Sequence, residues 1–347
     1  MPMPEGPRAS RLLLSARLLS SPLAPLLAAL LFAGIAFSLL SPYFLTPQNL
    51  LNIGRQIAVV SVVALGVTAV IIAGEIDLSM GSVMALSSVV IGVVLHEKGQ
   101  GAALTDVALA VFAALCTGFC LGLFNGVLTV VAKLPSFIVT LGTLSIGSGL
   151  ALSYRQGTPE PIASAAFLRT FGDGTIAGVL PVLVVYPAVL FGVLWFLLGF
   201  TWFGIQTYAT GGNTEAARLA GVPVGRVKIT ALVLSGVLSG VAGVLGTARV
   251  RTAMPQLGAG IELDAIAAAV LGGTRLSGGY GTAPGTLLGV MLIGVVSNGL
   301  TLLGVRSPVQ LVIKGMIIIA AVLFDRARAA GWLKRMPREP DLTARRR

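Results

Sequence analysis

The amino-acid sequence predicts an all-α protein, a polytopic membrane helix bundle of about eight to ten spans with broken helices. Composition gives the first reason: 55% of the residues are hydrophobic and 11% are charged, whereas a soluble domain carries roughly 25% charged residues. The second reason is that apolar runs long enough to cross a bilayer recur along the chain. The stretches between them are short, so we expect residues 1–347 to form a single transmembrane domain.

The candidate spans follow from the lengths of the apolar runs, because a helix needs about 20 apolar residues to cross the hydrocarbon core. The run at 104–131 is long for one untilted crossing. The run that starts at residue 263 is interrupted by the glycine-rich stretch 272–285, which predicts a broken helix. In chain order the candidate spans are 23–41, 55–73, 80–96, 104–131, 136–153, 181–200, 229–248, 263–273 continued by 284–304, and 308–325.

The charge distribution orients the chain and sets aside one class of partner. Lys and Arg number 24 against 13 acidic residues, which gives a formal net charge of +11. In a soluble protein this excess would suggest nucleic acid, but here the basic residues flank apolar runs, so we expect lipid and no nucleic acid. Basic flanks mark the cytoplasmic side of a membrane. They place the N-terminal segment 1–22 and the basic tail 326–347 in the cytoplasm, with an even number of crossings between them.

Two of the polar loops are predicted to lie on opposite sides of the membrane. Residues 201–228 hold three basic residues against a single acidic one, so this loop is expected to be cytoplasmic. Residues 154–180 carry balanced charge, which suits the other side, and the single candidate span 181–200 separates the two loops.

Nothing in the sequence supports catalytic or metal chemistry. Cys116 and Cys120 lie within one apolar run, and His96 lies at the end of another. We interpret the two cysteines as small buried hydrophobic residues. The motifs HExxH and GxSxG are absent, and so is any Cys/His cluster. We therefore expect no catalytic residue and no metal site in this chain.

A weak internal repeat links two glycine-rich interruptions of apolar runs, AGEIDLSMGS at 73–82 and LGGTRLSGGYG at 271–281. Each contains a Gly, then Leu-Ser, then Gly. Asn125 and Asn298 each belong to an Asn-Gly pair that is followed by a proline and a further apolar run. Glycine-interrupted segments at matching positions of two halves are typical of transporters. The residues assigned to the two helix breaks are Gly74, Asp77, Ser79, Gly273, Ser277 and Gly278.

Glu75 and Asp77 in the first break allow more than one interpretation. On a helix, side chains two residues apart do not share a face. On an extended segment they would, but no base, metal ligand or nucleophile lies near them in sequence, so a catalytic pair is not favoured. Carboxylates inside a membrane are candidates for ion coupling, which keeps an ion-coupled secondary transporter as an alternative. The favoured interpretation is a helix break in which Asp77 or Ser79 caps a helix that begins near Met80.

A short helix is predicted inside the cytoplasmic loop. Asn213 or Thr214 can cap it, Glu215 and Arg218 lie one turn apart, and Gly221 is the expected stop. A helix of about seven residues is unstable alone in water, so it needs a partner or the base of the bundle to pack against. The chain has no G-x-x-x-x-G-K-[ST] motif; if ATP drives transport, another chain must hydrolyse it.

Several long stretches in the same order make the chain similar to the permease subunits of bacterial ABC importers for simple sugars, the ribose/xylose/galactose-type branched group. The resemblance covers about residues 25–325, and its strongest stretches are GEIDLSMGSVMALSSVV, KLPSFIVTLGTLSIGSGLALS, YATGGNTEAARLAGV and GAGIELDAIAAAVLGGTRLSGGYGTAPGTLLGVMLIGVVSNGLTLLGV.

The resemblance implies a non-catalytic permease of the bacterial inner membrane without a cofactor of its own. It implies a second permease copy, ATP-binding subunits that hold ATP and Mg, and an extracytoplasmic binding protein that delivers a monosaccharide or similar small polyol. It also implies that the segment 211–221 is the coupling helix that enters a groove of the ATPase. The coupling residues would be Glu215, Ala216, Ala217, Arg218 and Gly221.

A neutral sugar needs hydrogen-bonding groups and stacking surfaces rather than charge. The resemblance leaves the sugar open, and the chain departs from the family pattern at Glu75, Arg275 and Tyr280. Besides the ion-coupled alternative, a scaffold or channel-like protein without coupling is the third class considered. The candidate pathway residues are Asn125, Ser136, Phe137, Thr140, Thr143 and Asn298.

Overall fold

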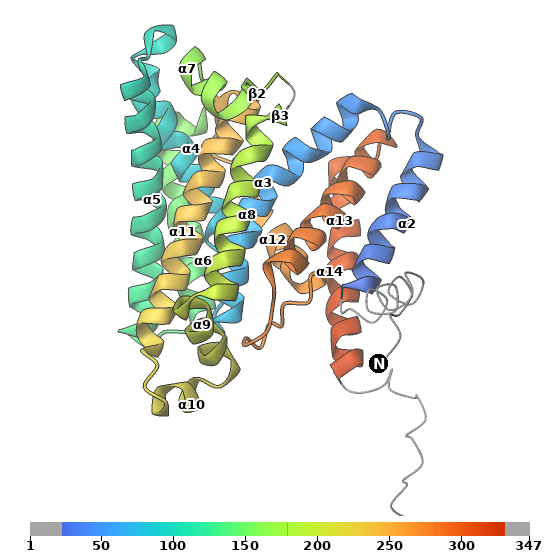
Figure 1. Ribbon diagram of the computed structural model, residues 1–347. Helices are drawn as coiled ribbons and strands as arrows, with labels where there is room; N and C mark the ends of the chain where they lie inside the picture. The colour runs from blue at the N-terminus through green and yellow to red at the C-terminus, as the bar shows by residue number, and fades with distance from the viewer. Residues whose placement is uncertain (1–22, 179, 330–347) are drawn as a thin grey trace, which may run out of the picture.

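The computed structural model describes residues 23–178 and 180–329, and it is built almost entirely of α-helices (Figure 1). The prediction of an all-α fold is therefore confirmed. The long helices are α2 (Ala24–Leu40), α3 (Pro47–Ile72), α4 (Met80–His96), α5 (Leu104–Val130), α6 (Ser136–Ser153), α8 (Val182–Phe200), α11 (Val224–Val250), α13 (Ala283–Leu302) and α14 (Ser307–Ala329). The short ones are α7 (Ala165–Leu168), α9 (Trp202–Gly212), α10 (Thr214–Leu219) and α12 (Ile261–Leu271).

Length and composition of the helices confirm a protein that crosses a membrane several times. Among the described residues, 6 helices are long and apolar enough to span a bilayer, namely α3, α5, α6, α8, α11 and α13. Helices α2 and α4 are apolar but shorter. Large apolar side chains such as Phe32 and Leu39 point outward from α2, as expected where lipid replaces water.

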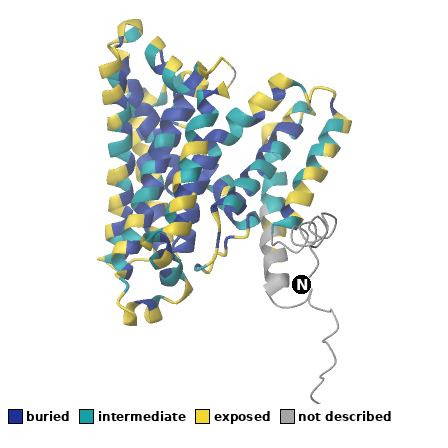
Figure 2. Cartoon of the chain, in the orientation of Figure 1, coloured by how far each residue is buried: buried dark blue, intermediate teal, exposed yellow. Residues whose placement is uncertain are grey.

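Helix α3 is the centre of the bundle. It packs against α8, α11, α12 and α13, and nearly every residue from Ser61 to Ile72 is buried. Figure 2 shows buried residues along the inside of the bundle and exposed residues along its outer faces. The core therefore surrounds the C-terminal half of α3, which leads directly into the first predicted break.

Small residues allow α5 and α11 to approach until their backbones touch. A Cβ atom at Gly118 would overlap the carbonyl oxygen of Gly236, and a Cβ atom at Gly236 would overlap the carbonyl oxygen of Gly118. Gly122 lies against the same helix, where its Cβ atom would sit 2.9 Å from the Cα atom of Val233. Close approach of this kind holds membrane helices together by dispersion contacts.

Two helices begin earlier than the apolar runs predict. Helix α3 begins at Pro47, because the Thr46 hydroxyl accepts the N–H of Asn49 at 3.4 Å and proline suits the first helical position. Helix α11 begins at Val224, directly after Pro223. In both cases polar first turns extend the helix beyond its apolar part, which hydropathy does not detect.

The two polar loops lie at opposite ends of the bundle, as predicted (Figure 1). One end carries α7 and two small antiparallel pairs, β1 (Glu160–Pro161) with β4 (Thr252–Ala253) and β2 (Thr175–Ile176) with β3 (Leu180–Pro181). The other end carries α9 and α10. Helix α2 begins, and α14 ends, at this second end (Figure 1). Segment 1–22 and residues 330–347 of the tail lie outside the described residues.

Candidate functional site

Both predicted breaks begin with the same helix stop. At the end of α3, Gly74 has φ +82°, its N–H donates to the Ile71 carbonyl at 2.9 Å, and the next N–H, of Glu75, donates to Val70 at 3.0 Å. A positive φ at this position favours glycine, which has no Cβ atom to clash. The backbone then runs without helix to Met80, where α4 begins.

The end of α12 repeats this geometry. Gly273 has φ +89°, its N–H donates to Val270 at 2.9 Å, and Thr274 donates to Ala269 at 2.9 Å. The two other predicted residues of this break, Ser277 and Gly278, lie in the turn that follows before α13 begins. The two stops therefore support the sequence-based pairing of the breaks.

Asp77 organises the first break through buried hydrogen bonds. Its Oδ1 accepts the backbone N–H of Ser79 at 2.8 Å and the Ser79 hydroxyl at 2.6 Å, and its Oδ2 accepts the Ser235 hydroxyl of α11 at 2.7 Å. The expectation that Ser79 itself caps α4 is wrong, because its side chain makes no capping hydrogen bond. The hydroxyl is instead engaged by the carboxylate, the stronger acceptor.

Four of the six predicted pathway residues join this break from α5 and α6. Asn125 donates to the Ser79 hydroxyl at 2.9 Å and accepts the Thr143 hydroxyl at 2.5 Å. Ser136 accepts the N–H of Ile76 at 3.0 Å, and Thr140 donates to the Ile76 carbonyl at 3.3 Å. All four side chains are buried. Their hydrogen bonds hold the extended backbone of the break against two helices, α5 and α6.

The other two predicted pathway residues lie elsewhere. Asn298 exchanges two hydrogen bonds of 2.9 Å with the buried amide of Asn49 on α3. Phe137 is 48% exposed on α6. The structure therefore does not bring the six residues into one site, and Asn298 does not bond to its break as Asn125 does.

The two breaks meet at the end of α9. Gly279 donates its N–H to the carbonyl of Ile72, the last residue of α3, at 2.9 Å. A Cβ atom at Gly211 would overlap that carbonyl and lie 2.6 Å from the Gly279 nitrogen. Nearby, the Tyr208 hydroxyl of α9 donates to the Gly281 carbonyl at 2.7 Å. Three segments distant in sequence thus pack backbone to backbone, directly before α10.

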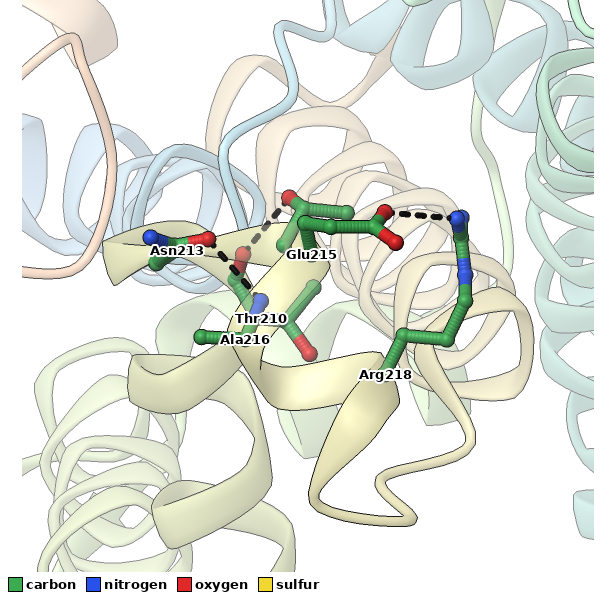
Figure 3. Close-up of polar contacts among 6 residues, drawn as sticks. Thr210, Asn213, Glu215, Ala216 and Arg218 are labelled. Atoms are coloured by element: carbon green, nitrogen blue, oxygen red, sulfur yellow. Dashed lines mark hydrogen bonds and ion pairs between the residues drawn. The ribbon is translucent and has the colours of Figure 1, made fainter.

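Helix α10 is short and capped at both ends, as the sequence predicts (Figure 3). Most of its residues are exposed. The Asn213 side chain accepts the N–H of Ala216 at 3.0 Å, while Thr214 donates its hydroxyl to the Thr210 carbonyl instead of capping. Glu215 and Arg218 form an exposed ion pair of 2.9 Å. Gly221, with φ +83°, ends the helix.

One surface feature of α10 was missed by the sequence analysis. Leu219 is 82% exposed, whereas Ala217, two residues earlier, is buried. The spacing of the two residues could have predicted this difference, because residues two apart on a helix face different directions. Once Ala217 faces the bundle, Leu219 must project away from it. Leu219 therefore extends outward from the tip of the polar loop, on a different face of α10 from the buried Ala217.

A cleft of about 390 Å³ lies behind α10, between it and the end of α5. Its wall contains Lys133, Arg218 and Lys228 but only one acid, Glu75, which pairs with the Lys228 ammonium at 2.5 Å. The Glu75–Lys228 pair therefore joins the first break to the beginning of α11. In the second break, the Arg275 guanidinium lies over the ring of Tyr280, with its Cζ atom 4.8 Å from the ring centroid.

The described residues contain no group of three or more His, Cys, Asp or Glu side chains that could hold a metal ion. The contacts described above are hydrogen bonds, ion pairs and close backbone approaches. These features suit a conformational relay between the ends of helices.

Comparison with known proteins places the chain in a family. The model of the family described as "Branched-chain amino acid transport system / permease component" matches residues 49–322. The ribose import permease protein of Bacillus subtilis is 44% identical over 85% of this chain and 90% of that protein. The L-arabinose ABC transporter permease protein of Azospirillum brasilense is 38% identical over 84% of each chain.

A third relative, the D-allose transport system permease protein of Escherichia coli, is 36% identical over 84% of this chain and 87% of that protein. No solved structure matches the chain. Matches of this length and identity, over the breaks as well as α10, show the family: the chain belongs to the branched-chain transport permeases, in the group of ABC importer permease subunits that includes the ribose, arabinose and allose permeases.

Proposed function

We propose that this chain is the membrane permease of an ATP-driven importer for a monosaccharide or a similar small polyol. The relatives named for ribose, arabinose and allose support a sugar as the cargo. An uptake experiment in which ribose, arabinose and allose compete would determine which sugar is carried. The chain itself hydrolyses nothing; ATP and Mg bind to separate ATPase subunits.

The observation that carries the proposal is the exposed, doubly capped helix α10. A helix of 6 residues is too short to be stable alone in water, yet this one is held by an Asn213 cap, a Gly221 stop and the buried side chain of Ala217. It presents Leu219 outward beside a basic cleft. We assign it as the coupling helix, with the exposed Glu215, Ala216 and Arg218 as contacts of the ATPase.

The packing at Gly211 supplies a route from α10 to the interior. A movement of α10 is transmitted to the end of α9, which touches both breaks through backbone atoms. Glu75 and Lys228 add a second connection from the loop 201–228 to the first break. Backbone contacts and a largely buried ion pair transmit displacement better than exposed side chains do, since close packing leaves little room for independent movement.

This assignment also fixes orientation. The end of the bundle with α10 faces the cytoplasm of a bacterial cell, and both termini lie on that side of the inner membrane. The end with α7 faces the sugar-binding protein outside. Residues 1–347 act as one transmembrane domain that pairs with a second permease copy and with lipid, without nucleic acid.

Copurification of the ATPase tests the proposal. Leu219→Asp places a charge on the exposed tip of α10, and Ile176→Asp is the matched control, because Ile176 is exposed at the opposite end. We expect Leu219→Asp to lower the recovered ATPase at least tenfold and Ile176→Asp to leave it unchanged. Equal recovery with both variants would contradict the coupling assignment, and sugar uptake driven by a pH gradient without ATPase would favour the ion-coupled alternative.

A further inference from the structure

A second cleft, of about 240 Å³, lies between the beginning of α4, the middle of α6 and the turns that lead into α12. Gly81 is the second residue of α4, and Glu262 is the second residue of α12. A Cβ atom at Gly81 would overlap the Glu262 carboxylate. The first turns of α4 and α12, each of which follows non-helical backbone, therefore meet at this cleft.

The cleft is lined by polar side chains with unused hydrogen-bonding capacity. Within the described part of the chain, neither the Ser148 hydroxyl nor the Gln256 side-chain amide makes a hydrogen bond, although both line the cleft. Glu262 lines it too, and its carboxylate accepts only backbone N–H groups, its own and that of Gly260. These groups offer donors and acceptors to a molecule that enters.

The buried cluster around Asp77 differs in this respect. There, Asn125 bonds both to Thr143 and to Ser79 of the break, and both Asn125 and Thr143 are almost fully buried. A sugar could bind to them only by displacing these bonds, and a buried polar group left unpaired costs about 1–3 kcal/mol. The cluster holds the break in place, whereas the cleft can accept a ligand.

The lining also indicates the charge of the ligand. It contains one carboxylate, Glu262, and no Lys or Arg. An anion such as a sugar phosphate would be repelled at this site, whereas the hydroxyl groups of a neutral sugar can donate to Glu262 and exchange hydrogen bonds with Gln256 and Ser148. Charge-assisted hydrogen bonds from hydroxyls to a carboxylate are among the stronger ones available to a neutral ligand.

We propose that this cleft is the subsite that holds the neutral sugar during its passage, and this proposal rests on the proposed import function. Its hydrogen-bonding groups are Ser148, Gln256 and Glu262. It replaces the sequence-based pathway set of Asn125, Ser136, Phe137, Thr140, Thr143 and Asn298, which the structure does not join into one site.

Two variants of α6 distinguish the effect of filling the cleft from the effect of adding bulk elsewhere on the same helix. Ser148→Trp fills the cleft, whereas Ser145→Trp places the same bulk on an exposed face of α6 outside it. The readouts are uptake of the sugar and stimulation of the ATPase by the binding protein, both in the assembled transporter. We expect Ser148→Trp to lower uptake at least tenfold while ATPase stimulation persists, and Ser145→Trp to stay within twofold of the wild type.

Thiol labelling supplies a second measurement that does not depend on transport. In a background with Cys116→Ala and Cys120→Ala, a charged membrane-impermeant thiosulfonate reagent should modify Ser148→Cys at least tenfold faster than Ser145→Cys, because the cleft admits water and lipid does not. Equal labelling, or normal uptake by Ser148→Trp, would overturn the subsite while leaving ATP-driven import intact. Failure of the wild type to import sugar with ATP would instead refute the proposed function.

Discussion

Replacing Gly211 by alanine perturbs the point where α9 touches both breaks. The added Cβ atom would overlap the Ile72 carbonyl and lie 2.6 Å from the Gly279 nitrogen, so the 2.9 Å hydrogen bond between these two residues must open. Overpacking of this kind costs about 1–3 kcal/mol, and the lost hydrogen bond adds about 1 kcal/mol.

The neighbouring residue Gly212 provides a matched control. It lies in the same helix, and a Cβ atom there would meet nothing within 4 Å. Both glycines lie in the last turn of α9, so the intrinsic difference between alanine and glycine is similar at the two positions. The difference between the two variants therefore isolates the contact, and it amounts to about 2–4 kcal/mol.

Thermal unfolding of the purified permease in detergent measures this difference. We expect the apparent melting temperature of Gly211→Ala to lie at least about 5 °C below that of Gly212→Ala. Stimulation of the partner ATPase by the binding protein should weaken in Gly211→Ala and persist in Gly212→Ala. Equal melting temperatures and equal stimulation would refute the backbone relay between α10 and the breaks.

Three further outcomes follow from single contacts. Glu75→Gln and Lys228→Met should each destabilise the protein, because removing one partner of a largely buried ion pair leaves the other uncompensated. The double variant should recover most of the loss, and a double-mutant cycle without coupling would contradict this. Gly236→Ala should lower the melting temperature by several degrees more than Gly149→Ala, whose Cβ atom would meet nothing within 4 Å; a smaller loss would argue against close packing of α5 on α11. Asn298→Ala should lower stability by about 1–3 kcal/mol, because the buried Asn49 amide loses both hydrogen bonds to Asn298 and keeps only its bond to the Phe44 carbonyl. The variant should retain ATP-driven uptake; loss of uptake in a stably folded variant would return Asn298 to the pathway.

Hydropathy and capping chemistry predicted the helices well, because each rests on local sequence. The helix boundaries at Met80, Leu104 and Ser136 agree with the predicted runs, and Asn213 caps α10 through its side chain as expected. Local signals fail where polar first turns extend a helix, as they do in α3 and α11.

The hydrogen bonds of the polar interior could be predicted only in part, since their partners come from segments that are distant in sequence. Asn125 and Asn298 look equivalent in sequence, yet one bonds to Ser79 of its break and the other to Asn49 of α3. Similarly, nothing in the sequence near Glu262 reveals that Gly81 lies against its carboxylate. Such contacts depend on how the extended segments cross the bundle, which hydrophobic periodicity does not encode.

Uptake of labelled ribose into proteoliposomes tests the central claim most directly. The vesicles would contain this permease with the ATPase subunits that copurify with it, and the binding protein would be added outside. We predict uptake that requires ATP inside and the binding protein outside, that is lost with Leu219→Asp, and that an imposed pH gradient does not replace. Uptake of the sugar without ATPase, driven by the pH gradient, would contradict the account.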